Sequence, residues 1–269
     1  MGPLSGYRII ELGGLGPAPM CGLLMADLGA EVILVERPGK AEIGVEPTKL
    51  IERRSKRSIE LNLKDERSVD IILRLVETAD ALIEGFRPGV TERLGLGPVD
   101  CFGRNPKLVY GRVTGWGQDG PLSQTAGHDI NYISLAGVLD AIGPANGRPF
   151  PPLNLVGDYG GGAMYLVCGL LAGLLEAQKS GQGQVIDAAM LDGALFQMSL
   201  FFSLSAIGRW REERGSNHLD GGAPYYRTYE TEDQKYLAVG ALEQKFYDEF
   251  LEGLGINNVD LPNRMDPAN

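Results

Sequence analysis

Residues 7–19 read YRIIELGGLGPAP, and this segment gives the strongest indication of the fold. Its first half, Tyr7 to Leu12, is apolar and strand-forming, and its second half is a glycine-rich turn. Pro19 to Leu28 then has the pattern of a helix, and Glu31 to Val35 is another short run of Val and Ile. The order strand, helix, strand predicts a βαβ opening, which is typical of a parallel sheet.

The same alternation continues along the chain. Strand-like runs are expected at 58–64, 81–84, 108–113 and 185–188, and helices at 66–78, 128–139 and 161–179. We therefore predict an α/β fold, with a Rossmann-like parallel sheet that carries helices on both faces. This large domain is expected to span residues 1–189.

The last third of the chain has a different pattern. A long helical stretch, Leu191 to Trp210, belongs to an expected helical connector over residues 190–223. Short strands at 225–230 and 236–241 and a helix at 244–254 follow, and they predict the start of a smaller α+β domain over residues 224–269. This small domain looks incomplete.

Composition excludes several classes of protein. The 269 residues carry a net charge of -10, which argues against a nucleic-acid surface because phosphate backbones are bound mainly by Lys and Arg. Three widely spaced cysteines predict neither a metal site nor a disulfide framework. The apolar run Ala163 to Leu175 is shorter than the ~20 residues that cross a bilayer, so we interpret it as core. An intracellular, soluble protein is expected, cytoplasmic or, in a eukaryote, peroxisomal or mitochondrial.

The glycine-rich turn only weakly matches a dinucleotide fingerprint. Pro19 replaces the third glycine of the Gly-x-Gly-x-x-Gly pattern, and Arg37 follows Glu36, the acidic residue that would bind a ribose. A nicotinamide dehydrogenase is therefore disfavoured. The sequence at this turn is as compatible with binding a phosphate as with binding a ribose.

Basic residues near strand ends predict an anion site. Residues 53–57 read RRSKR, either a solvated loop or a cluster that an anion balances. Open α/β sheets bind ligands at the carboxyl ends of their strands, and further cations lie near such ends: Arg37, Lys64, Arg87 and Arg93. Their convergence favours a polyphosphate nucleotide.

Two residues thirty positions apart suggest proton transfer. His128 lies in the segment GHDINY at an expected helix start, where the helix dipole disfavours the imidazolium and favours a neutral base. Asp158 lies in GDYGGG before a long helix, where it could be the N-cap, a catalytic carboxylate or both. The glycines after it could present backbone N–H groups to a ligand oxygen. His218 has no comparable setting and is expected to be structural.

Motifs along the whole chain resemble those of the family III CoA-transferase (CaiB/BaiF-type) superfamily, and within it the α-methylacyl-CoA racemases. The resemblance rests on the following segments: IELGGLGP at 10–17, ADLGA at 26–30, Arg37-Pro38, KRS at 56–58, LNLK at 61–64, GWGQ at 115–118, GHDINY at 127–132, PLNL at 152–155, GD at 157–158, GQVIDA at 183–188 and DGGAP at 220–224.

The resemblance implies particular roles for these residues. His128 and Asp158 would be the two acid-base groups that invert a 2-methylacyl-CoA thioester through an enolate, with Glu243 as the partner of the histidine. Contacts to CoA are implied at Arg37, at Leu61, Asn62, Leu63 and Lys64, and at Gly127, His128, Asp129, Ile130, Asn131 and Tyr132. Additional phosphate contacts are expected at Arg54, Arg87 and Arg93. The resemblance implies no metal and no cofactor, since CoA enters as part of the acyl-CoA substrate.

Two alternatives stay open. In the CoA-transferases of the superfamily, the aspartate that matches Asp158 is the acyl-accepting nucleophile, whereas His128 favours a racemase. The resemblance also implies an interlocked homodimer whose small domain continues past residue 269. The chain is therefore expected to be truncated, and a catalytically impaired CoA-binding fragment is the other alternative.

Overall fold

The computed structural model describes residues 2–39, 45–46 and 49–264. The chain divides into two compact units, one made of residues 1–139 and 151–200 and the other of residues 140–150 and 201–269. The first unit contains the predicted parallel sheet, and the second contains a small antiparallel pair of strands.

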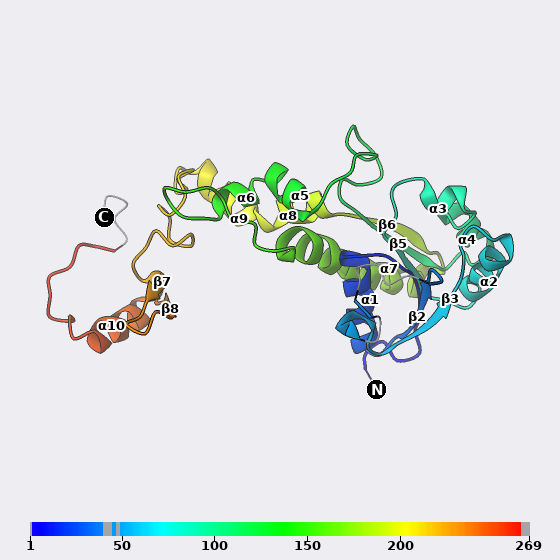
Figure 1. The fold of residues 1–269 in the computed structure, drawn as a ribbon, viewed down its shortest axis with the longest axis horizontal. Coiled ribbons are helices and arrows are strands. Elements are labelled where there is room, and N and C mark those ends of the chain that lie inside the picture. Colours follow the sequence, from blue (N-terminus) through cyan, green and yellow to red (C-terminus); the bar gives the residue numbers. More distant parts are fainter. Residues whose placement is uncertain (1, 40–44, 47–48, 265–269) are drawn as a thin grey trace. The chain divides into compact units, whose positions relative to one another are not determined.

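The sheet of the first unit has six strands, all parallel (Figure 1). They are β1 (Arg8–Leu12), β2 (Glu31–Glu36), β3 (Lys56–Glu60), β4 (Ala81–Glu84), β5 (Val109–Thr114) and β6 (Gln184–Ala189), arranged in the order β3-β2-β1-β4-β5-β6. This is the order of a Rossmann fold, so the predicted fold class is confirmed.

Helices cover both faces of the sheet because its strands are apolar on both sides. Successive side chains of a strand point to opposite faces, and in β1 the fully buried Ile9 and Ile10 accordingly belong to different cores. The core that contains Ile9 is completed by α1 (Pro17–Asp27) and α7 (Met164–Ser180), and the core that contains Ile10 by α2 (Glu66–Val76) and α4 (Pro98–Arg104). The helix pairs lie on opposite sides of the sheet in Figure 1.

Several boundaries differ from the sequence expectations. The strand expected at 58–64 is β3 and ends at Glu60, so residues 61–64 lie beyond its carboxyl end. The helix expected at 128–139 is split into α5 (Asp129–Leu135) and α6 (Val138–Ala141), because Gly137 between them adopts a left-handed φ of 77°. The stretch 191–210 likewise forms two short helices, α8 (Met190–Gln197) and α9 (Ser199–Ala206).

The long helix expected from residue 161 is preceded by a different helical segment. A π-helix, η3 (Leu155–Ala163), runs directly into α7. The combined segment Leu155–Ser180 is long and apolar enough to cross a bilayer, and 44% of its most apolar window is buried within the fold. Leu166, Leu170 and Leu174 of α7 pack on the sheet, as in the core helix that the sequence predicts.

The second unit has a small core of its own. Its strands, β7 (Tyr226–Glu230) and β8 (Tyr236–Gly240), are antiparallel, and α10 (Gln244–Gly253) follows them, as the sequence predicts. Tyr225 is 2% exposed and packs against Tyr247 of α10 edge to face. Its hydroxyl also bonds to Nδ1 of His218 at 2.7 Å, which agrees with the structural role expected for this histidine.

Candidate active site

The candidate site lies at the carboxyl edge of the sheet. The strand order reverses between β1 and β4, and open α/β sheets bind ligands outside the strand ends at such a switch point. The glycine-rich turn follows β1, the loop that carries Arg87 follows β4, and the segment that leads to His128 follows β5. Topology thus brings three predicted segments to one edge.

One hydrogen bond connects Asp158 to the residue that follows His128. The backbone N–H of Asp158 donates to Oδ2 of Asp129 at 2.7 Å, and Asp129 is the neighbour of His128. Groups thirty positions apart in the sequence are therefore held at the start of α5. The bond therefore brings together the two chain segments that carry the predicted acid-base residues.

His128 occupies the N-cap position of α5, as the sequence predicts. Its backbone is extended, and its N–H donates to Oδ1 of Asn131 at 3.0 Å, the reciprocal half of a capping box. The His128 side chain is exposed, and within the described residues its ring has no hydrogen-bond partner. The imidazole is therefore available to a ligand.

Asp158 does not have the N-cap role that the sequence suggests. It lies in the middle of η3, and α7 begins six residues later with Ala163 as its N-cap. Asp158 is thus free of a capping bond, and Oδ2 accepts a hydrogen bond from Nδ2 of Asn154 at 3.3 Å. π-Helical turns are rare and often mark functional sites.

The pKa of Asp158 is raised above its ordinary value. Burial of the carboxyl group is the main cause. The hydrogen bond from Asn154 opposes the rise, the negative charge of Asp129 adds to it, and His128 opposes it. A carboxyl with a raised pKa is a stronger base than an ordinary aspartate, which suits the removal of a weakly acidic proton.

The glycine-rich turn after β1 approaches Asp158 directly. Gly16 has a φ of 73°, and a Cβ at this residue would lie 3.2 Å from Asp158 Oδ2. The amino end of α1 begins at the next residue, Pro17. The glycine-rich turn, whose sequence weakly matches a dinucleotide-binding loop, therefore lies beside the carboxylate of Asp158.

The glycines after Asp158 serve close packing. A Cβ on Gly161 would lie 2.8 Å from the Ala194 nitrogen of α8, and one on Gly162 would lie 3.0 Å from Pro17 Cβ. The nearby N–H groups of Asp158 and Tyr159 are also occupied, since they donate to Asp129 Oδ2 and to the Asn154 carbonyl. These two N–H groups are therefore not free to bind an oxyanion, and the role of the glycine N–H groups stays a prediction.

Tyr132, from the predicted CoA-binding segment, is packed beside the same residues. Its ring meets Trp116 edge to face at 4.7 Å, and a Cβ on Gly115 would lie 2.4 Å from its hydroxyl. Burial raises the pKa of Tyr132 to about 12; Asp158 adds to the rise and Arg87 opposes it. The hydroxyl therefore keeps its proton near neutral pH.

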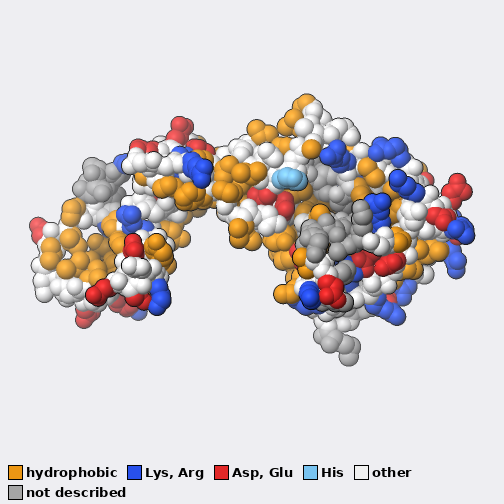
Figure 2. Space-filling view, viewed as in Figure 1, with side chains coloured by type: hydrophobic (Ala, Val, Ile, Leu, Met, Phe, Trp, Pro, Cys, Tyr) orange, Lys and Arg blue, Asp and Glu red, His pale blue; other side chains and the backbone are white. Residues whose placement is uncertain are grey.

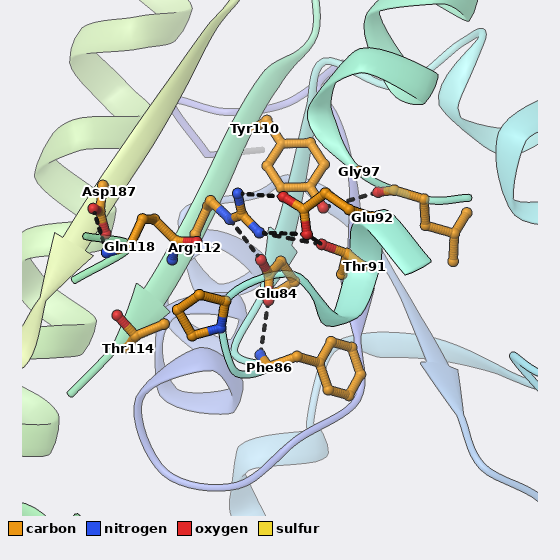
Figure 3. Close-up of polar contacts among 12 residues, drawn as sticks. Glu84, Phe86, Thr91, Glu92, Gly97, Tyr110, Arg112, Thr114, Gln118 and Asp187 are labelled. Atoms are coloured by element: carbon orange, nitrogen blue, oxygen red, sulfur yellow. Dashed lines mark hydrogen bonds and ion pairs between the residues drawn. The ribbon is translucent and has the colours of Figure 1, made fainter. Parts of the chain in front are cut away.

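The loop that carries Arg87 is held by a buried ion-pair network (Figure 3). Arg112 of β5 pairs with Glu84 of β4 at 2.8 Å and with Glu92 of α3 (Val90–Arg93) at 2.8 Å. The other oxygen of Glu84 accepts the Phe86 N–H at 2.7 Å. These contacts hold the loop at Glu84 and Phe86 on one side of Arg87 and at Glu92 on the other. The backbone that carries Arg87 is therefore fixed at both ends.

The basic cluster at 53–57 is balanced inside the protein. Its four cations all have carboxylate partners, which the sequence did not predict: Arg53 with Glu36, Arg54 with Asp27, Lys56 with Glu11 and Arg57 with Glu31. Glu36, the candidate ribose ligand, is thus paired with Arg53. A phosphate contact by Arg54 stays a prediction, and it would compete with Asp27.

Other predicted cations have no such partner. Within the described ranges, no carboxylate lies within 4 Å of the cationic groups of Arg37, Lys64, Arg87 or Arg93, and all four residues are exposed. Arg37 and Arg87 follow β2 and β4, the two neighbours of β1, and Lys64 follows β3, which pairs with β2. Figure 2 shows Lys and Arg side chains, mixed with acidic ones, on the side of the first unit where α2 and α3 lie.

Comparison with known proteins identifies the family. The family "CoA-transferase family III" matches residues 4–268. The chain belongs to CoA-transferase family III. It is 45% identical over 265 residues to the alpha-methylacyl-CoA racemase of Mus musculus and 43% identical over 266 residues to that of Homo sapiens. These alignments cover 98% and 97% of this chain, and 68% and 67% of the relatives.

A solved structure agrees with the family III assignment. The fold matches a CAIB/BAIF family protein from Brucella suis with a TM-score of 0.81 at 26% identity, over 96% of this chain and 71% of that chain. The parallel sheet and its helices are therefore those of the family.

The sequence reasoning gave no role to Asn154, whose position four residues before Asp158 is the only sequence signal for its hydrogen bond to that carboxylate. Glu243, predicted as the partner of His128, is an exposed residue at the N-cap of α10 in the second unit, so its role stays a prediction. Among the residues that the structure describes, no three His, Cys, Asp or Glu side chains cluster as metal ligands would.

Proposed function

We propose that this protein is an isomerase that interconverts the (R) and (S) epimers of 2-methylacyl-CoA thioesters. The observation that carries the proposal is the juxtaposition of His128 and Asp158 through Asp129, in a chain 43–45% identical to proteins named alpha-methylacyl-CoA racemase. An imidazole and a carboxylate are two groups that can each take or give a proton near neutral pH.

The proposed reaction uses one group on each side of the α-carbon. For one epimer, the Asp158 carboxylate takes the α-proton, the C–H electron pair moves into a planar enolate, and protonated His128 returns a proton to the opposite side. For the other epimer the roles are exchanged. The raised pKa of Asp158 supports its role as a base, and the exposed ring of His128 supports access to the thioester.

The CoA moiety is proposed to bind across the carboxyl ends of β2, β3 and β4. Arg37, Lys64, Arg87 and Arg93 would neutralise its phosphates, and Leu61, Asn62 and Leu63 would contact it beyond β3. The segment from Gly127 to Tyr132 would contact the end of CoA nearest the thioester. The proposed chemistry requires no metal or further cofactor.

A homodimer and an intracellular location, cytoplasmic, peroxisomal or mitochondrial, stay predictions from the resemblance. The chain spans about two thirds of the racemases that it matches.

Deuterium exchange tests the proposed function. Each epimer of a 2-methylacyl-CoA is incubated with the protein in deuterium oxide, and inversion and α-deuterium uptake are measured separately. The wild type should invert both epimers and incorporate deuterium. His128→Ala and Asp158→Asn should each lose inversion by about 10²-fold or more, while each retains exchange with a different epimer. Inversion that persists in either variant would remove that residue from the mechanism.

The CoA-transferase alternative has one supporting observation, since the half-buried Asp158 carboxylate could also accept an acyl group. A transferase would form an acyl-aspartyl intermediate, which hydroxylamine or borohydride traps. Trapping at Asp158 without α-deuterium uptake would favour the transferase.

A further inference from the structure

Asp129 has an environment that its predicted contact with CoA does not explain. Asp129 is only 6% exposed, and its Oδ2 accepts a hydrogen bond from the Asp158 N–H at 2.7 Å. Its other oxygen, Oδ1, is buried and has no hydrogen-bond partner within the described residues. Burying a carboxylate with an unused oxygen costs free energy, so a functional reason is expected.

The chain leaves room for this carboxylate. A Cβ on Gly157 would lie 2.6 Å from Asp129 Oδ2 and 2.9 Å from its Cγ, closer than side chains pack. Only a glycine before Asp158 therefore allows the carboxylate to reach the Asp158 N–H. The contact fixes η3 against the start of α5.

The same carboxylate acts on Asp158 through its charge. The polar groups that act on the Asp158 carboxyl are Asn154 from the start of η3 and Asp129 and His128 from the start of α5, and the phenols of Tyr132 and Tyr159 respond to its charge. Asp129 is the negative charge in this set. A neighbouring negative charge makes a carboxylate hold a proton more strongly.

We propose that Asp129 is a positioning residue, whose carboxylate fixes the Asp158 backbone beside His128 and whose charge sets how strongly Asp158 holds the substrate's α-proton. This inference rests on the proposed function. The Asp129 side chain thus affects both the position of Asp158 and the strength of Asp158 as a base. The substitutions Asp129→Asn and Asp129→Ala separate these two effects.

Asp129→Asn keeps an oxygen acceptor for the Asp158 N–H and removes the charge. Exchange of the epimer that Asp158 deprotonates should slow by about three- to tenfold, and the acid limb of its pH profile should move to lower pH. Exchange of the other epimer should change less, and KM should stay near that of the wild type. A profile equal to that of the wild type for both epimers would overturn the inference.

Asp129→Ala removes both acceptor and charge, and Gly157→Ala displaces the carboxylate. Both should lower kcat more than Asp129→Asn does, by about tenfold or more, because a small misplacement of a reacting group is costly. Asp70→Asn, an exposed aspartate of α2, is the control for a lost charge and should leave both epimers unaffected. Full rates in Asp129→Ala would overturn the positioning role, and if that variant does not fold, Asp129→Asn carries the test.

The two proposals fail in different ways. A wild-type protein that exchanges neither epimer contradicts the proposed function, and with it this inference. A wild type that exchanges both epimers, with an Asp129→Asn variant that does the same at every pH, contradicts the role of Asp129 alone.

Discussion

Glu11 and Lys56, forty-five positions apart, form an ion pair of 2.7 Å whose side chains are 0% and 1% exposed. Lys56 also donates to the Pro19 carbonyl of α1 at 2.9 Å. The pair joins β1, β3 and the helix whose amino end faces Asp158 through Gly16. It is the buried part of a sequence cluster that suggested an anion site.

Removing one partner of this pair should be costly. At pH 8, Lys56→Met should lower the free energy of unfolding by about 3–5 kcal/mol, because it leaves the buried carboxyl group of Glu11 without its cation. The double variant Glu11→Met/Lys56→Met should be more stable than that single variant. Urea unfolding measures both, and the exposed pair of Lys49 with Glu46 gives the control Lys49→Met, expected within about 0.5 kcal/mol of the wild type. A double variant as unstable as the sum of its singles would contradict the coupling.

The same carboxyl predicts a pH dependence of stability. Burial raises the pKa of Glu11 from 4.5 to about 7, against the opposing charge of Lys56. A group whose folded pKa is raised stabilises the fold below its unfolded pKa, and this contribution is lost as pH rises from about 4.5 to 7. Glu11→Gln should therefore flatten the stability profile in this window. An unchanged slope in urea unfolding between these pH values would be the contrary result.

Arg112 should connect stability with substrate affinity. Arg112→Met leaves Glu84 buried without its cation, which we expect to cost about 3–5 kcal/mol, and frees the loop that presents Arg87. KM for the acyl-CoA should rise more than kcat falls, because the loop belongs to the proposed CoA site. Arg104→Met, which removes an exposed pair with Glu77, should change neither stability nor KM appreciably. An unaltered KM in folded Arg112→Met would argue against the loop's role.

Asn154 should tune Asp158 in the direction opposite to Asp129. Its hydrogen bond lowers the pKa of Asp158, so Asn154→Ala should raise that pKa further. The acid limb for the epimer that Asp158 deprotonates should then move to higher pH, whereas Asp129→Asn moves it lower. Deuterium exchange as a function of pH measures both shifts. Shifts in the same direction would exclude this electrostatic account.

Gly16 should tolerate no side chain. Gly16→Ala imposes a left-handed φ of 73° on alanine, at a cost of about 1 kcal/mol, and places Cβ 3.2 Å from Asp158 Oδ2. We expect kcat to fall about tenfold or more with a small loss of thermal stability. Gly14→Ala is the control for stability, since a Cβ at Gly14 has nothing within 4 Å and Gly14 needs no positive φ. Full activity in Gly16→Ala would show that this turn does not shape the site.

The parallel sheet, the helices on its two faces and the position of His128 at a helix start could all be predicted from the sequence. These features follow from local patterns: β1, β2 and β4 are short, mostly apolar runs, and α2 has a clear amphipathic period. The family resemblance was also carried by local motifs, and it holds from residue 4 to residue 268.

The pairing of side chains that are distant in the sequence could be read from the three-dimensional structure alone. The sequence left Asp158 as a cap of α7, a catalytic carboxylate or both. The residue lies inside a π-helix instead of at the cap, and Gly161 and Gly162 let that segment pack tightly on α8 and α1. The cations of residues 53–57 form ion pairs with carboxylates of the same chain. The carboxylate of Asp129 accepts a hydrogen bond from the Asp158 N–H, and the absence of a side chain at Gly157 makes room for it. Such contacts join residues tens of positions apart, and they depend on how the sheet places the ends of its strands, which a local sequence pattern does not specify.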